Sequence, residues 1–319
     1  MKMRIVKWRK FMRVVRMNYK SVTVLMSTYN GEKFVKDQIE SILKQNNVDV
    51  SLIIRDDGST DNTLSVINNY SKCKEVTIVK SSENLGYKNS FLTLLKYIPE
   101  TSDYVAFSDQ DDLWLPEKLE KAVQKLEYIN ATPYKLYYSS LMFVDQSLNT
   151  LGKKSFSKFD NTFGSEMVRN SAAGTTMVFT RELADLAVKS EKVFDLPDGH
   201  DSWIFKLNLA VGGKVSYDDE SYILFRRHEN NASNAGKKWI NKLFYEFKAK
   251  NVAYSTAEIL LSNIYKHQLT QEAKNITSQI LGYKSSLKNR IMLLKNHKLR
   301  RENRIMNNIM YFKILTKKF

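Results

Sequence analysis

The sequence predicts an α/β protein with a doubly wound, mostly parallel sheet that is covered by helices on both faces. Short β-rich runs alternate with helical patterns through residues 21–108. The chain has 319 residues, 43% of them hydrophobic, which is enough for a large buried core. Its single cysteine, Cys73, excludes an internal disulfide and a cysteine-based zinc site, and it fits a reducing compartment. No apolar run approaches the roughly 20 residues of a membrane span.

Each predicted element follows from a local pattern. Strands are expected at residues 21–26, 51–55, 76–79 and 104–108. Apolar residues at helical spacing in residues 34–43 predict the first crossover helix. Thr60 or Asp61 can cap a second helix, which runs to residue 70, and residues 88–97 form a third. Parallel strands joined in this way bind ligands at their carboxyl ends.

Polar loops follow all four strands. They read Ser27-Thr28-Tyr29-Asn30-Gly31, Asp56-Asp57-Gly58-Ser59, Asn84-Leu85-Gly86 and Asp109-Gln110-Asp111-Asp112. None is a glycine-rich phosphate loop of the GxxxxGK[ST] or GxGxxG type, so P-loop and dinucleotide-binding folds lose their main support.

The acidic loop after the fourth strand has two interpretations. Asp109, Asp111 and Asp112 repel one another unless a cation neutralises them, and hard carboxylate oxygens suit Mg²⁺ or Mn²⁺. Alternatively, they form a solvated turn that caps a helix starting near Pro116. The position at the end of a strand favours the metal site.

Three further segments carry possible chemistry. Tyr29 and Asp57 at the sheet edge could stack on a nucleobase and accept its imide N–H, or Tyr29 could simply pack on the next helix. Asp201, beside His200, could remove a proton from an attacking hydroxyl, or it could cap the helix that follows. The segment 225–231 offers arginines and a histidine for a diphosphate, although such residues are often structural.

Taken in order, these motifs resemble a known family. The four loops are followed by Leu113-Trp114, Gly174-Thr175-Thr176, His200-Asp201-Ser202-Trp203 and Arg227-His228-Glu229-Asn230-Asn231. The set resembles the inverting family-2 glycosyltransferases of the GT-A fold, and within them the bacterial rhamnosyltransferases of cell-wall and capsular polysaccharide synthesis. The resemblance covers residues 21–235.

The resemblance implies roles for individual residues. It implies a nucleotide-sugar site at Ser27, Thr28, Tyr29, Asn30, Asp56, Asp57, Asn84, Gly86, Asp109, Gln110 and Arg227. It implies a pocket for the donor sugar and acceptor at Trp114, Gly174, Thr175, Thr176, His200 and Trp203. It implies a Mn²⁺ or Mg²⁺ site at Asp109, Asp111, Asp112 and His228. Asp201 matches the catalytic general base. Ser202 stands where relatives often carry a second aromatic residue, so an acceptor pocket different from theirs is expected.

The implied reaction is transfer of a sugar, with inversion, onto a hydroxyl of a lipid-linked glycan or polysaccharide precursor. L-Rhamnose from dTDP-rhamnose is the expected donor sugar. A UDP-sugar carrying galactose, glucose or N-acetylglucosamine is the alternative.

The charge of +16 lies at the two ends of the chain. Residues 1–20 hold eight basic residues and no acid, residues 237–319 hold 18 basic and four acidic residues, and residues 21–236 are net acidic. We therefore expect a basic amphipathic segment at 1–20, a catalytic domain at 21–236 and a basic helical region at 237–319. Met17 is an alternative start.

Both basic ends suit an anionic membrane. Met1, Ile5, Trp8, Met12 and Val15 share one helical face, and the C-terminal region repeats the pattern. We expect peripheral attachment to the cytoplasmic face of the cell membrane; alternatively, the C-terminal helices pack on the core or pair two copies. A nucleic-acid-binding protein is the competing class, but the acidic middle would repel phosphate, so no nucleic-acid partner is expected.

Overall fold

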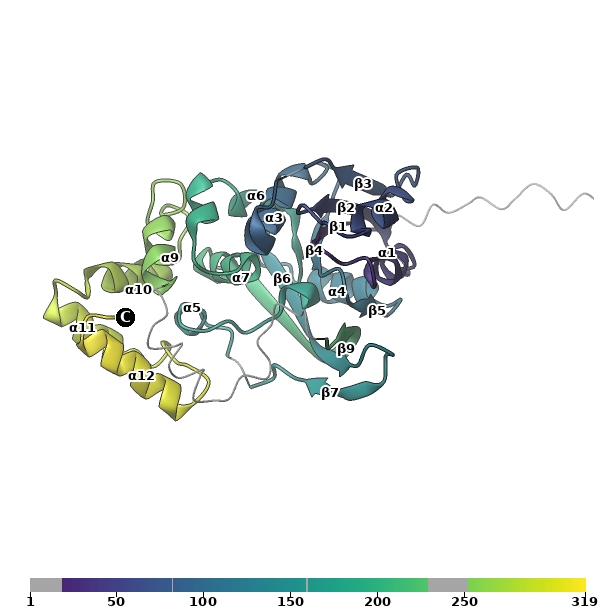
Figure 1. Ribbon diagram of the computed structural model, residues 1–319. Coiled ribbons are helices and arrows are strands. Elements are labelled where there is room, and N and C mark those ends of the chain that lie inside the picture. The colour runs from purple at the N-terminus through teal and green to yellow at the C-terminus, as the bar shows by residue number, and fades with distance from the viewer. Residues whose placement is uncertain (1–18, 82, 159, 229–251) are drawn as a thin grey trace, which may run out of the picture.

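The computed structural model describes residues 19–81, 83–158, 160–228 and 252–319 (Figure 1). Its centre is a nine-stranded sheet in the order β3-β2-β1-β4-β8-β6-β9-β5, with β7 paired to β6. The predicted segment 1–18 and the end of the last motif, Glu229-Asn230-Asn231, lie outside the described residues.

The predicted parallel half is confirmed. Its strands are β1 (Ser21–Thr28), β2 (Asp49–Asp56), β3 (Val76–Val79) and β4 (Tyr104–Ser108), and all pairs among them are parallel. The connecting helices are α1 (Val35–Leu43), α2 (Thr63–Asn68) and α3 (Gly86–Leu94), with the 3₁₀ turn η1 (Leu95–Tyr97) extending α3. The N-cap position of α2 is Asn62, so neither Thr60 nor Asp61 is the cap as expected, although Asp61 accepts the N–H of Thr63 at 2.9 Å.

The second half of the sheet mixes directions and was not predicted strand by strand. Its strands are β5 (Leu113–Trp114), β6 (Lys135–Val144), β7 (Thr150–Lys154), β8 (Val178–Thr180) and β9 (Lys214–Arg226). β8 runs antiparallel to both β4 and β6, while β9 runs parallel to β6. Its helices are α4 (Lys118–Glu127), α5 (Phe163–Glu166), α6 (Arg181–Ala187) and α7 (His200–Ala210), with 3₁₀ turns η2 (Gly174–Thr176) and η3 (Glu191–Asp195).

Apolar residues cover both faces of the sheet. Along β1, Leu25 belongs to one buried cluster, and Val24 and Met26 belong to the other. This alternation follows from the two-residue period of a strand, and burial on both faces is typical of parallel sheets. The carboxyl ends of β1, β2 and β4 are thereby held together at one edge.

The basic C-terminal region is helical, as expected. It forms α9 (Val252–Leu260), α10 (Gln271–Gly282), α11 (Leu287–Lys295) and α12 (Arg304–Leu315). Helices α9 and α10 contact α7, and buried residues of all four helices join the larger apolar cluster of the catalytic half. The expected boundary at residue 236 falls outside the described residues, so the domain division stays a prediction. Within the residues described, the helices are all too short or too polar to cross a bilayer.

Candidate active site

The loops after β1 and β2 are tied together by side-chain hydrogen bonds. Asn30 Oδ1 accepts the N–H of Thr60 at 2.8 Å, and Ser59 Oγ accepts the N–H of Asn30 at 2.9 Å. Asp56 accepts the hydroxyls of Thr28 at 2.9 Å and Ser59 at 2.6 Å. Of the residues expected to bind the nucleotide, Thr28, Asn30 and Asp56 therefore use their side chains to hold these two loops together.

Tyr29 is joined to the acidic loop by Gln110. The Gln110 amide accepts the N–H of Tyr29 at 2.9 Å and donates to the Tyr29 carbonyl at 2.9 Å. The Tyr29 ring is 49% exposed at the sheet edge, where a base can stack on it. A Cβ on Gly31 would lie 2.1 Å from Gln110 Oε1, so only glycine leaves room for this clamp.

Asp57 lies in a buried ion pair with Arg55, a residue that the sequence motifs did not identify as part of the site. Arg55 also donates to Ser90 Oγ at 2.9 Å, and Ser27 donates to the same Ser90 hydroxyl at 2.6 Å. Asp57 Oδ1 further accepts the N–H of Leu85 at 2.8 Å. The sequence did contain a signal for this pair. Arg55 directly follows the apolar run SLII of a buried strand, and a buried arginine needs a carboxylate partner.

The turn before α3 is built by Asn84 and Gly86. Asn84 Oδ1 accepts the N–H of Gly86 at 3.1 Å, and Gly86 has a positive φ of 75° that favours glycine. Both residues shape the start of a helix whose buried Ser90 supports the Arg55 network.

The three acids after β4 have different environments. Asp111 Oδ2 lies 2.7 Å from His228 Nε2 at the end of β9. Burial, together with Asp111 and then Asp201, raises the pKa of Asp109 to about 7. Asp112 is fully buried and accepts the hydroxyl of Thr175 at 2.9 Å, and burial raises the pKa of its carboxyl. Asp109, Asp111 and Asp201 thus share one acidic site, and Asp112 supports it from behind.

Asp111 and His228 carry donor atoms of the kind that a divalent cation binds, and in this structure the two side chains contact each other directly. A carboxylate oxygen and an imidazole nitrogen that already face each other are suitable ligands for Mn²⁺, and Mg²⁺ and Mn²⁺ complete their shells with phosphate oxygens and water. In the part of the chain that the structure describes, no group of three or more His, Cys, Asp and Glu side chains is placed to hold a metal ion by itself. The arrangement therefore suits a cation that arrives with a diphosphate.

The last residue of β9, Arg226, anchors the end of the strand two residues before His228. Arg226 donates to Asp37 on α1 at 2.8 Å and lies over the ring of Phe34. The Arg227 guanidinium lies 5.0 Å from the centre of the Phe143 ring. Phe34 also contacts His228, with ring centres 5.3 Å apart, so α1 fixes the histidine from one side.

Asp201 lies in the first turn of α7, against the turn η2. A Cβ on Gly174 would lie 3.2 Å from the Cβ of Asp201 and 3.1 Å from His200 Nε2, so η2 touches α7 only because residue 174 has no side chain. Asp198 accepts from both Ser202 and Lys206 and fixes the entry to the helix. Ser202, the departure noted in the sequence, is thus used for this hydrogen bond.

His200 is stacked in an aromatic cage and does not line an open pocket. Its ring lies 4.1 Å from the centre of Phe91 and 4.6 Å from that of Phe107. Burial lowers its pKa to about 4, with only partial compensation from Asp201. A neutral imidazole therefore supports Asp201 from beneath. Thr176 donates to the carbonyl of Ala173 at 2.7 Å and stabilises η2.

The two tryptophans expected in the sugar pocket are in the core, which corrects that expectation. Trp203 is 1% exposed and donates its indole N–H to the carbonyl of Ala187. Trp114 is 2% exposed, and Lys118 Nζ lies 3.5 Å from the centre of its ring. Burial lowers the pKa of Lys118 to about 7, although Asp112 opposes the shift. Their positions in the motifs predicted contact with a ligand, but both side chains pack instead against apolar residues of the core.

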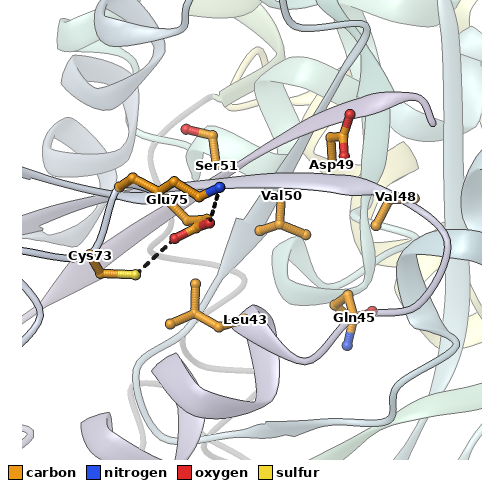
Figure 2. Close-up of a pocket in the computed structure, with 9 residues that line it drawn as sticks. Leu43, Gln45, Val48, Asp49, Val50, Ser51, Cys73 and Glu75 are labelled. Atoms are coloured by element: carbon orange, nitrogen blue, oxygen red, sulfur yellow. Dashed lines mark hydrogen bonds and ion pairs between the residues drawn. The ribbon is translucent and has the colours of Figure 1, made fainter. Parts of the chain in front are cut away.

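A surface hollow elsewhere carries none of the predicted chemistry. It is lined by residues at the amino end of β2, including Asp49 and Ser51, and by the segment before β3 (Figure 2). Figure 2 shows Cys73 Sγ directed at Glu75, with 3.0 Å between the sulfur and the carboxylate. The hollow lies at the opposite end of the strand from Asp56 and Asp57.

The sequence matches the family model described as "Glycosyl transferase family 2" over residues 23–183. The chain belongs to this family. It is a glycosyltransferase, which decides against the competing class of nucleic-acid-binding proteins as a description of the catalytic half. The match runs from within β1 to the first turn of α6, and it therefore includes the loops after β1 and β2, the acidic loop and η2.

Curated relatives of this family 2 chain extend beyond the matched segment. It is 29% identical over 296 residues to a Shigella flexneri protein named dTDP-rhamnosyl transferase RfbG, covering 87% of this chain and 94% of that protein. It is 30% identical over 105 residues to an Escherichia coli protein named UDP-Glc:alpha-D-GlcNAc-diphosphoundecaprenol beta-1,3-glucosyltransferase WfgD, covering 33% of this chain and 40% of that protein.

The GT-A fold expected from the resemblance is confirmed by solved structures. TarS 1-349 of S. aureus, in complex with UDP-GlcNAc, superposes with a TM-score of 0.56 at 18% identity. The superposition covers 93% of this chain and 80% of that one, so the similarity includes the C-terminal helices.

Proposed function

We propose that this family 2 enzyme transfers a sugar from a nucleoside diphosphate to a hydroxyl of a glycan acceptor, with inversion at the anomeric carbon. One arrangement carries the proposal: the Asp111–His228 contact at the carboxyl edge of the sheet, with Asp109 and Asp201 close enough for their charges to interact. These residues follow β4, follow β9 and begin α7, and the fold brings them together.

The nucleotide would bind across β1 and β2. The Tyr29 ring stacks on the base, and Asp57 accepts the imide N–H that thymine and uracil share. Arg55 holds the Asp57 carboxylate in place, with side chains only 2% and 3% exposed. Ser27 and the loop residues complete this subsite, and Asp109 faces the ribose.

Asp111 and His228 would hold Mn²⁺ or Mg²⁺ against the diphosphate. The cation stabilises the negative charge that the diphosphate gains as it leaves. Arg227, the residue before His228, would add a positive charge for the diphosphate.

Asp201 would act as the general base. It removes the proton from the acceptor hydroxyl while that oxygen bonds to the anomeric carbon, and the bond from this carbon to the diphosphate oxygen breaks. A single displacement inverts the configuration and needs no second, nucleophilic carboxylate. Gly174 lies against His200 and Asp201, Thr175 donates to Asp112, and the turn η2 that holds them would underlie the sugar site.

The donor is proposed to be dTDP-L-rhamnose. The support is the identity to the protein named dTDP-rhamnosyl transferase, which spans nearly the whole of both chains. UDP-glucose is the second candidate, supported by the shorter match to the protein named as a glucosyltransferase. The acceptor is proposed to be a lipid-linked glycan, and the support is the name of the glucosyltransferase WfgD, whose acceptor is a diphosphoundecaprenol-linked sugar.

A thermal-shift screen tests the donor. The full chain is mixed with dTDP-rhamnose, UDP-glucose, UDP-galactose or UDP-N-acetylglucosamine, each with Mn²⁺, with Mg²⁺ or with a chelator. We expect dTDP-rhamnose with a metal to raise the melting temperature most. Equal stabilisation by all four donors would contradict selection of dTDP-rhamnose, because the site would then not distinguish the sugars. No stabilisation by any donor would overturn the proposed site.

A further inference from the structure

Helices α11 and α12 each have two apolar faces. On one side, Leu293 of α11 and Met306, Met310 and Ile314 of α12 are buried. On the other side, large apolar side chains are 41–63% exposed: Leu287, Ile291, Met292, Ile305, Phe312 and Leu315. A helix that only packs on the core is polar on its outer side, so the outer apolar residues need another explanation.

The same segment is strongly basic. Residues 283–319 contain eleven lysines and arginines and one acid, Glu302. Lys288 and Lys295 flank the exposed apolar residues of α11, and Arg304 begins α12. The helical period places four of these residues on the same side of α11: Leu287, Lys288, Ile291 and Lys295. Basic residues around an apolar stripe are typical of a helix that lies in the interface of an anionic bilayer.

We propose that the outer faces of α11 and α12, defined by Leu287, Ile291, Met292, Ile305, Phe312 and Leu315 with their neighbouring basic residues, dock on an anionic lipid surface. Charge complementarity decides the occupant. The high positive charge would make a second copy of this face repel the first, whereas phosphatidylglycerol-type headgroups attract it. Nucleic acid would satisfy the charge but would leave the apolar side chains in water.

The position of the two helices suits this use. They lie at the end of the molecule opposite β1–β3 (Figure 1). Their inner faces are anchored in the same apolar cluster as α7, which carries Asp201. The catalytic half is therefore held rigidly relative to the docking face, and nothing in the active site is needed for docking.

Flotation with vesicles tests the proposal on the full chain. Vesicles of phosphatidylcholine alone are compared with vesicles of phosphatidylcholine and phosphatidylglycerol in equal amounts. We expect binding only to the anionic vesicles. The triple variant Lys288→Gln, Lys295→Gln and Arg304→Gln should lower the partition coefficient about 100-fold at low salt, because each basic residue contributes about fivefold near such a surface.

A second variant separates the apolar part. Leu287→Ser with Leu315→Ser should weaken binding at both low and high salt, because hydrophobic insertion is not screened. The matched controls remove the same groups elsewhere: Lys72→Gln, Lys189→Gln and Lys192→Gln for charge, and Leu64→Ser with Leu151→Ser for apolar surface. These lie outside α11 and α12 and are expected to bind as the wild type does.

Three results would overturn the proposal. They are binding that both variants retain in full, equal loss in the control variants, and light scattering that shows a dimer dissociated by the same substitutions. Calorimetry of UDP and dTDP with Mn²⁺ is expected to be unchanged in every variant. That readout reports the active site separately, so failure of docking and failure of the proposed transfer are distinguishable.

Discussion

His228, at the end of β9, lies 2.7 Å from the carboxylate of Asp111, although 117 positions separate them in the sequence. The contact joins the parallel half of the sheet to its mixed half. In the proposed mechanism the same two side chains would hold a divalent cation, and the diphosphate would supply some of its remaining ligands.

Asp111→Ala and His228→Ala should each remove the metal-dependent part of nucleotide binding. Calorimetry of UDP and dTDP should show affinity in Mn²⁺ falling at least about 100-fold, because a bound metal contributes several kcal/mol to phosphate charge stabilisation. Affinity in chelator should be unchanged. The double variant should lose no more than either single one. The exposed His267→Ala is the control, and unaltered Mn²⁺ dependence in His228→Ala would contradict the ligand assignment.

Asp201→Asn should abolish transfer and leave donor binding intact. The amide keeps the size of the side chain but cannot accept the proton, so kcat should fall on the order of 100- to 10,000-fold. Calorimetry with UDP and dTDP checks the donor site. Asp195→Asn changes an exposed carboxylate just before α7 and should be neutral. Loss of nucleotide binding in Asp201→Asn would show that the base is another residue.

Gly31→Ala and Gly174→Ala should fail in different ways. A Cβ at residue 31 displaces the Gln110 amide from Tyr29, so nucleotide affinity should fall. A Cβ at residue 174 presses on His200 and Asp201, so kcat should fall at least about tenfold while nucleotide affinity stays. Steady-state kinetics and calorimetry on both variants give this split. The reverse pattern would contradict the division into donor and acceptor sides.

Arg55→Met should strongly destabilise the protein. It leaves the Asp57 carboxylate buried without its cation, which costs about 3–5 kcal/mol of unfolding free energy. Urea denaturation measures this. Arg181→Met is the matched control, because its partner Asp185 is half exposed and such pairs contribute about 0–1 kcal/mol. Adding Asp57→Asn to Arg55→Met should recover part of the loss, and no recovery would argue against the pair.

His200 should make the protein less stable in acid. Its folded pKa of about 4 lies below the unfolded value of 6.5, so the unfolded state binds the proton first as pH falls. This contribution is fully present above about pH 6.5 and is lost progressively down to about pH 4. Urea denaturation should show a loss of about 2 kcal/mol between about pH 7 and pH 5. His200→Phe should remove that part of the loss, and an identical pH profile would contradict the buried neutral imidazole.

The parallel half could be predicted because its signals are local. The strand and helix patterns of residues 21–108 repeat with short connections, and each strand ends in a polar loop. The mixed half could not, since β8 has only three residues and β9 pairs with β6 across a long stretch of chain. Such pairings depend on tertiary contacts that no short window of sequence contains.

The site could be predicted only in part, because some of its residues are marked by local motifs and others only by their tertiary contacts. Asp109, Asp111 and Asp201 stood out by type and position, whereas Arg55, Asp198 and Lys206 are noticed only when their buried partners are seen. Trp114 and Trp203 were assigned to a pocket from their motif neighbours, and packing placed both indoles in the core. Motif membership identifies a segment, but it does not say which of its side chains pack into the apolar core.

The β4–β8 boundary divides the site along the sequence. Every residue proposed to hold the nucleobase or ribose lies in residues 27–109, which end just after β4. The proposed floor of the sugar site and the proposed catalytic base Asp201 lie in residues 174–201, which begin just before β8. Substitution in the later segment can therefore alter which acceptor is glycosylated without rebuilding the nucleotide site. An ancestral gene could diversify its products in this way, provided that two links across the boundary persisted: Asp112 with Thr175, and Asp111 with His228.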